Sequence, residues 1–194
     1  MRDLETFSGL TPHLLQRIGA LFVNCNRFER QAERTLWVLK QEDVRGKVPS
    51  TAKYKPMQII TELETLAAKY EANMAEAIRL TCATARDVLT YRNCIAHGEL
   101  FSFGDDTRFI ANLGPMGEIK KYPEETALIN ENFLDIAIAT VFTVYRSISL
   151  IGLEVSGPPG ASLNGVHAIE TLRNVASAMS ALLSDPALRF FREM

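Results

Sequence analysis

The chain has 194 residues, of which 47% are hydrophobic and 23% are charged, which is enough apolar material for one domain with a complete core. Its net charge of -2 excludes the general attraction to nucleic acid of a strongly basic domain, so RNA binding would need a local patch, and nothing favours DNA. Three single cysteines and an N-terminus without an apolar signal segment predict a reducing, cytoplasmic location. Neither these cysteines nor the three scattered histidines have the spacing of a metal site, so no metal or cofactor is expected.

A long first helix is predicted from Thr11 to about Gln41. Thr11 supplies a capping hydroxyl, and Pro12 fits the first helical position because its missing N–H costs nothing there. Apolar residues then recur at three- and four-residue steps from Leu14 to Leu39, which is typical of a helix with one face on the core.

A loop is predicted between this helix and a second helix spanning about 56–70, because a glycine and two prolines interrupt the helical period. Four cations lie in the loop: Arg45, Lys47, Lys53 and Lys55. Such a run is usually a solvated surface. The alternative is that Lys53 and Lys55 contact an RNA backbone.

The third helix is predicted from about Ala75 to His97, after a short break at 71–73. No Pro or Gly interrupts it, and Gly98 stands where a left-handed cap is expected. On an ideal helix four polar residues fall within about 60° of one another. These residues are Arg86, Thr90, Asn93 and His97.

Arg92 falls instead in the apolar sector of the third helix, about 140° away from His97. A guanidinium keeps its charge, so a buried one needs an anion. The anion is either a structural carboxylate, for which Glu33 of the first helix is the candidate, or a bound phosphate. The choice between these two decides the function.

Two short aromatic and β-branched runs, 100–103 and 108–113, flank a Gly-Asp turn after the third helix and predict a β-hairpin beside His97. An edge strand is expected over 118–122. The fourth helix is predicted from a cap at Asn130 or Asn132 to about Glu154. Its apolar run, Phe133 to Leu153, is long enough to span a bilayer, but this run contains two charged residues and several hydroxyls, so we interpret the helix as the enclosed helix of a bundle without a membrane.

A Gly-Pro-Pro-Gly sequence at 157–160 ends the bundle, and an amphipathic helix follows over about 166–182. An isolated helix of this size is marginal in water, so it must dock on the bundle or on a second subunit. The predicted organisation is therefore a helical bundle over 1–156, followed by a C-terminal linker and helix over 157–194.

The set Arg92, Asn93 and His97, followed by Gly98 at the end of the third helix, resembles the signature of the HEPN superfamily. The resemblance implies a mainly α fold, a four-helix up-and-down bundle, here with a β-hairpin insertion after the third helix and an extra C-terminal helix. It also implies a homodimer in which two copies of the motif share one groove. Many members of the superfamily are metal-independent endoribonucleases of toxin and defence systems, so an antitoxin or regulatory protein is an expected partner.

The chemistry that the resemblance implies uses the 2′-hydroxyl of RNA as nucleophile and leaves a 2′,3′-cyclic phosphate. His97 would transfer protons, since an imidazole ordinarily titrates near neutral pH. Arg92 would grip the phosphate, and Asn93 would orient the imidazole or the phosphate. Further substrate contacts are expected from Arg86, Thr90, Lys53 and Lys55. The alternative is a non-catalytic binding or regulatory module of the same fold for a nucleotide, a small ligand or a partner protein.

Overall fold

The computed structural model describes residues 10–97, 99–103, 107–111, 126–156 and 165–183. In this part of the chain, five α-helices and one short 3-10 turn make most of the structure. They are α2 (Pro12–Lys40), α3 (Pro56–Leu66), the 3-10 turn η1 (Ala67–Lys69), α4 (Ala72–His97), α5 (Glu131–Ser156) and α6 (Gly165–Leu183).

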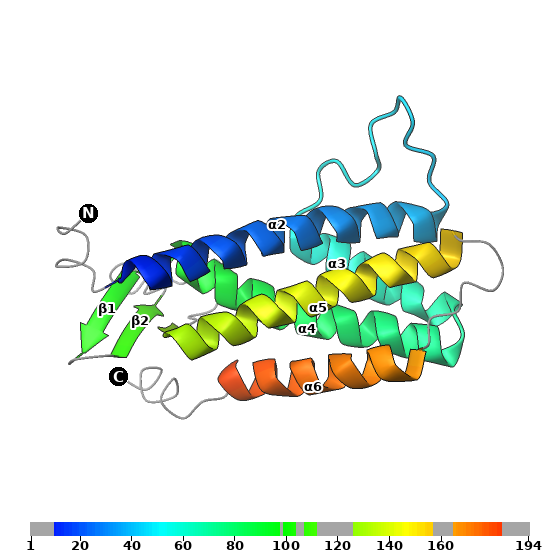
Figure 1. Ribbon diagram of the computed structural model, residues 1–194. Helices are drawn as coiled ribbons and strands as arrows, with labels where there is room; N and C mark the ends of the chain where they lie inside the picture. Colours follow the sequence, from blue (N-terminus) through cyan, green and yellow to red (C-terminus); the bar gives the residue numbers. More distant parts are fainter. Residues whose placement is uncertain (1–9, 98, 104–106, 112–125, 157–164, 184–194) are drawn as a thin grey trace, which may run out of the picture.

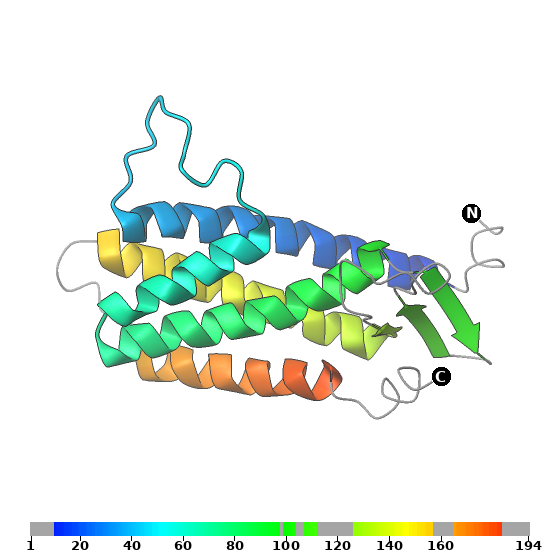
Figure 2. The same ribbon diagram turned by 180° about the vertical axis from the view of Figure 1, so that it is seen from behind.

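The helices form a bundle, which confirms the mainly helical fold predicted from the sequence (Figure 1). α2 and α5 lie side by side and run in the same direction, whereas α4 and α6 run in the opposite direction (Figures 1 and 2). α6 lies against both α4 and α5, and the shorter α3 lies against α2 and α4. The C-terminal helix therefore docks on the bundle of its own chain.

One step of the chain differs from the expected up-and-down order. The loop after α2 turns back alongside that helix, so α3 starts near the middle of the bundle and runs obliquely in the same sense as α2 (Figure 2). The turn is held by Thr51, whose hydroxyl donates to the Glu33 carboxylate (2.6 Å) and accepts from Nε1 of Trp37 (2.8 Å). These long-range hydrogen bonds set where α3 begins.

The ends of the first helix are those that its sequence predicts. The Thr11 hydroxyl accepts a hydrogen bond from the Leu14 amide (3.2 Å), and Pro12 occupies the first turn. Gln41 closes the helix in the left-handed region at φ 55°. The break before α4 falls at 70–71, slightly earlier than predicted, because α4 already begins at Ala72.

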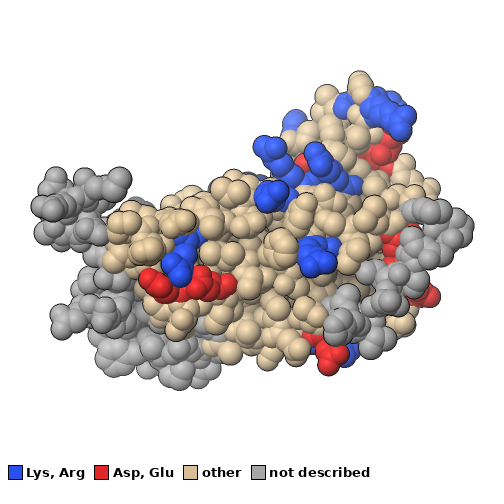
Figure 3. Space-filling model, in the orientation of Figure 1, with Lys and Arg blue, Asp and Glu red and all other residues tan. Residues whose placement is uncertain are grey.

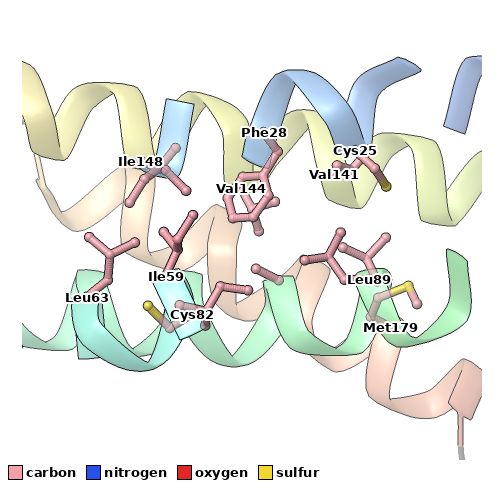
Figure 4. Packing of buried hydrophobic residues seen from close by; sticks show 14 of the residues in the cluster. Cys25, Phe28, Ile59, Leu63, Cys82, Leu89, Val141, Val144, Ile148 and Met179 are labelled. Atoms are coloured by element: carbon pink, nitrogen blue, oxygen red, sulfur yellow. The ribbon is translucent and has the colours of Figure 1, made fainter. Parts of the chain in front are cut away.

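The core lies between α2, α4 and α5 and is closed by α3 and α6. Buried side chains from all five helices point toward one another there (Figure 4). Large fully buried examples include Phe28, Ile60, Leu89, Ile148 and Leu172, one from each helix. Each such side chain contributes about 1.5–3 kcal/mol relative to the exposed state, so this shared core holds the helices in place.

α5 is the most apolar helix of the described part of the chain. Asn130 is its cap, not Asn132, because the Phe133 amide donates to Oδ1 of Asn130 (2.8 Å). By length and composition α5 is the one described helix that could cross a membrane, with 44% of its most apolar window buried inside the molecule. A core helix of a soluble protein meets the same criterion.

Three short strands lie between α4 and α5. β1 (Glu99–Phe103), β2 (Thr107–Ala111) and β3 (Thr126–Ile129) form an antiparallel sheet in the order β1-β2-β3. Phe109 of β2 is opposite Phe101 on one side and Leu128 on the other. The turn at 104–106 and the edge strand expected over 118–122 lie outside the described residues.

Candidate functional site

The last turns of α4 carry the three motif residues, which differ in solvent exposure. Tyr91 and Cys94 are buried, Arg92 and Asn93 are half-buried, and His97 is exposed. β1 begins at Glu99, so the motif stands where the bundle meets the small sheet (Figure 1). A long helix thus anchors the motif through its buried residues while the imidazole faces outward.

Arg92 is held against α2 by an ion pair with Glu29. The guanidinium Nη2 donates to Oε1 of Glu29, and the two side chains are only 16% and 20% exposed. The guanidinium also lies over the Phe22 ring, 6.0 Å from its centroid, in a cation–π contact. The sequence argument that Arg92 must have an anion is therefore confirmed, and in this structure the anion is a structural carboxylate.

The carboxylate is not the one expected. Glu33 was the candidate, but it lies one turn further along α2, and its carboxylate accepts the Thr51 hydroxyl instead. Glu29 follows Cys25 and Phe22 at steps of four and three residues, so these side chains share the face of α2 that meets Arg92. That spacing was the sequence signal for Glu29, but it does not separate Glu29 from Glu33 without knowledge of the helix rotation.

Burial dominates the electrostatics of this contact. Desolvation raises the pKa of Glu29 above its ordinary value, and the positive charge of Arg92 acts in the opposite direction. Beside them, burial raises the pKa of the Cys25 thiol to about 12, again opposed by Arg92. The pair is therefore a charge contact in a largely dry environment. Removal of either partner leaves the other charge buried, with nothing to offset the free energy of its desolvation.

Arg92 keeps one donor that the described residues do not satisfy. Its Nε is buried and has no hydrogen-bond partner in the described part of the chain. A buried unsatisfied N–H costs about 1–3 kcal/mol, so an acceptor at this donor would stabilise the contact. An anion that reached it would meet a guanidinium already oriented by Glu29.

Arg92 and His97 do not point to the same side of α4 within one chain. Five residues correspond to a rotation of about 140° on an ideal helix, and the two side chains differ in burial accordingly. Asn93 lies between them and is half-buried.

Of the four residues expected to contact substrate, Thr90 lies beside the motif on α4, whereas the other three are ion-paired or lie elsewhere. Arg86 is ion-paired with Glu64 of α3, and this pairing lowers the pKa of the Glu64 carboxyl. Thr90 is half-buried on α4. Lys53 and Lys55 are exposed in the loop beside the second half of α2, whereas α4 ends at the opposite end of the bundle, beside β1 (Figure 1).

Among the described residues, no three His, Cys, Asp or Glu side chains lie close enough together to hold a metal ion. Comparison with known proteins adds no relative: no protein-family model matches the chain, and neither curated proteins nor solved structures are significantly similar to it. Fold and site together describe a helical bundle with an inter-helix Arg–Glu pair beside an exposed histidine.

Proposed function

We propose that this chain is a metal-independent endoribonuclease of the HEPN type that acts as a homodimer in the cytoplasm. The observation that carries the proposal is the Arg-Asn-x-x-x-His order at the end of a long helix, with His97 exposed and one N–H of Arg92 unsatisfied. A toxin-like or defence role, controlled by an antitoxin or regulatory protein, belongs to the same proposal. The proposed fold type is a HEPN-type bundle with the strands inserted after α4.

The proposed reaction needs no group beyond the protein and RNA. A base removes the proton of a 2′-hydroxyl, and the oxygen attacks the neighbouring phosphorus. The bond from phosphorus to the 5′-oxygen breaks, and an acid returns a proton to that leaving oxygen. The products are a 2′,3′-cyclic phosphate and a 5′-hydroxyl. The imidazole of His97 is suited to both proton transfers.

Arg92 would bind a non-bridging phosphate oxygen through its free Nε–H and stabilise the charge that develops during attack. Glu29 would hold the guanidinium in place, which lowers the entropy cost of binding. Since Arg92 and His97 diverge on one helix, the proposal takes the two groups of each site from different subunits of a two-fold dimer.

A second function is favoured by one observation. Arg92 is already neutralised by Glu29, and both side chains are largely buried. This arrangement also suits a non-catalytic module of the same fold that binds a nucleotide, a small ligand or a partner protein, with the motif stabilising the bundle. The two proposals differ in what they predict for His97, because an exposed imidazole contributes nothing to a structural ion pair.

The test is to incubate the purified protein with mixed RNAs in the presence of EDTA and to map the chemistry of the new ends. We expect cyclic phosphate ends, and we expect His97→Ala to abolish them while the helical circular dichroism stays unchanged. His13→Ala is the matched control, because His13 is an exposed histidine outside the motif. Absence of cleavage, or cleavage that survives His97→Ala, would favour the non-catalytic binding module, and cleavage that stops with chelator would contradict the metal-independent mechanism.

Subunit mixing tests the shared site. Arg92→Ala and His97→Ala proteins are each inactive in the proposal, but a mixed dimer contains one intact pair of groups. We expect partial recovery of cleavage on mixing and none with either variant alone. Sedimentation analysis of both variants shows whether they still form dimers. Recovery without any dimer, or dimers without recovery, contradicts the shared groove.

A further inference from the structure

A basic surface lies on α2 and on the loop that follows it, outside the Glu29–Arg92 contact. Residues 26–55 contain eight Lys and Arg against four Asp and Glu, whereas the whole chain has a net charge of -2. Figure 3 shows Lys and Arg side chains gathered over α2 and this loop. The rest of the chain is therefore distinctly acidic, and positive charge is concentrated in one segment.

The few acidic residues of this segment do not neutralise its exposed cations. Each of the four carboxylates has a different partner: Glu29 pairs with Arg92, Glu33 accepts from Thr51, Glu42 accepts from Ser50, and Asp43 lies 3.6 Å from Lys47. Six exposed cations of this segment have no carboxylate within ion-pair distance among the described residues: Arg27, Arg30, Arg34, Arg45, Lys53 and Lys55. All of these except Arg45 form what we call the α2 basic surface.

The fold brings these five residues to one side of the molecule. Arg27, Arg30 and Arg34 fall within about 60° of one another on α2 and span about 10 Å of helix. The loop is tied to the same helix through Thr51, which bonds to Glu33 and Trp37. That contact holds the part of the loop that carries Lys53 and Lys55 against α2, and Figure 3 shows basic side chains over both segments.

Among the other cations of the described chain, some are ion-paired, whereas Lys69, Arg79 and Arg146 are exposed and unpaired but lie singly on η1, α4 and α5. Arg17 lies 2.8 Å from Asp135 and 3.3 Å from Glu131, and Arg173 pairs with Glu76. These are structural ion pairs between helices. The α2 basic surface has no such structural use, and three arginines in a row repel one another unless an anion covers them.

We propose that the α2 basic surface binds the phosphate backbone of RNA outside the cleavage site. Arginine suits this task because its planar fork binds phosphate through two parallel hydrogen bonds. The choice of RNA as the polyanion rests on the proposed ribonuclease function. The surface holds the substrate, and the motif at the C-terminal end of α4 acts on it.

Binding at this surface is tolerant of base sequence. The nearby aromatic rings are half-buried and occupied: Trp37 donates to Thr51, and the Tyr54 ring lies 5.7 Å from the Lys40 ammonium. Without an exposed ring, bases have no stacking platform on this surface, so contacts go to phosphates. Affinity should therefore fall steeply with salt and vary little between RNAs.

The experiment measures binding of a fluorescein-labelled, unstructured single-stranded RNA by anisotropy over a salt series, in EDTA. All proteins carry His97→Ala so that no cleavage occurs. The test protein adds Arg27→Gln, Arg30→Gln and Arg34→Gln. The control adds Lys69→Gln, Arg79→Gln and Arg146→Gln, which remove the same charge from exposed positions elsewhere.

We expect the test triple to weaken binding about tenfold or more and to reduce the salt slope by about 2, as for three lost phosphate contacts. The control triple should change affinity less than about twofold, since remote charges are screened. Equal weakening by both triples, or none by the test triple, overturns the proposal. So does loss of binding to phosphatidylserine vesicles with RNA binding intact, which would assign the surface to a membrane.

Failure of this inference is distinguishable from failure of the proposed function. With His97 intact, the test triple should raise KM for RNA cleavage and leave kcat and the cyclic phosphate ends unchanged. If the test triple cleaves RNA with an unchanged KM, only the proposed RNA-binding role of the α2 basic surface is contradicted. Salt-dependent binding at the surface in a protein that cleaves no RNA sinks the nuclease alone.

Discussion

Glu29 on α2 and Arg92 on α4 form an ion pair that joins two helices across 63 residues of sequence, with both side chains about four-fifths buried. Neither residue could be buried alone at neutral pH without a large desolvation cost. The pair therefore fixes how α4 is rotated against α2, and it fixes where the guanidinium stands relative to the exposed His97.

Removing Arg92 alone should lower the free energy of unfolding more than removing the charges of both Arg92 and Glu29. We expect Arg92→Ala to lower the free energy of unfolding by about 2–3 kcal/mol, because it leaves the Glu29 carboxylate without its partner in a dry contact. The double variant Glu29→Gln/Arg92→Met should recover at least half of that loss. Urea unfolding followed by circular dichroism measures both. A double variant as unstable as Arg92→Ala would mean that packing, not charge, holds the contact.

The stability of the Arg92→Ala variant relative to wild type should depend on pH. Burial raises the pKa of Glu29 above 4.5, and Arg92→Ala removes the charge that opposes this shift. A carboxyl with a raised folded-state pKa binds its proton more tightly when folded, so stability rises as pH falls through that pKa toward 4.5. The deficit of Arg92→Ala relative to wild type should therefore shrink on acidification. Urea titrations at a series of pH values test this, and a deficit that is constant with pH contradicts it.

Cys25 offers a local probe of the Glu29–Arg92 contact. Burial raises the pKa of Cys25 and of Cys82 to about 12, so in the folded protein both should resist iodoacetamide at neutral pH. Reaction requires local opening, which frees the thiol. Arg92→Ala should speed alkylation of Cys25 about tenfold, which corresponds to a decrease of about 1.4 kcal/mol in the free energy of local opening. Cys82 lies beside Arg86 and Glu64 and should change much less. Mass spectrometry of tryptic peptides separates the two sites, and equal acceleration would indicate global destabilisation.

The elements that the sequence predicts well are those set by local chemistry. The Thr11 cap, Pro12 and the apolar period place α2 within a residue of its observed ends. The amphipathic tail was expected to dock, and α6 does so on α4 and α5. What local chemistry cannot give is the direction of α3, because the loop before it is set by Thr51 binding to residues of α2.

The candidate site also combines features that one helix determines with features that depend on long-range contacts. The need of Arg92 for an anion follows from its position on the apolar side of α4, which is a property of one helix. Two long-range features explain why Arg92 pairs with Glu29 and not with Glu33. They are the rotation of α4 against α2 and the hydrogen bond that the Thr51 hydroxyl donates to Glu33. Likewise Lys53 and Lys55 could not be separated from His97 until the loop was placed.

Gly152 of α5 lies close against Thr35 of α2. A Cβ added there would lie 3.0 Å from Oγ1 of Thr35, whose hydroxyl donates to the Ile148 carbonyl (3.0 Å). Gly152→Ala should therefore destabilise the protein by about 1–3 kcal/mol through overpacking.

The control is Gly19→Ala on α2, where an added Cβ meets nothing within 4 Å. That change should stabilise the helix by about 0.5–1 kcal/mol, since alanine loses less entropy on folding. Thermal unfolding of the two variants should thus shift in opposite directions. A stabilising Gly152→Ala would show that α5 can move away from α2 at little cost.

Thr51 should control how firmly the loop is held on α2. Its hydroxyl serves both the Trp37 indole and the Glu33 carboxylate, and the side chain is 1% exposed. Thr51→Val keeps the shape but removes both hydrogen bonds, so we expect a loss of about 1–3 kcal/mol from two half-buried groups left without partners. Trp37 is the single tryptophan of the chain, so its fluorescence reports release of the loop as a red shift. Ser50→Ala is the matched control, because Ser50 bonds to Glu42 in an exposed position and should change neither stability nor fluorescence appreciably. If Thr51→Val leaves the emission unchanged, the loop is held by other contacts and the placement of its lysines does not depend on this hydroxyl.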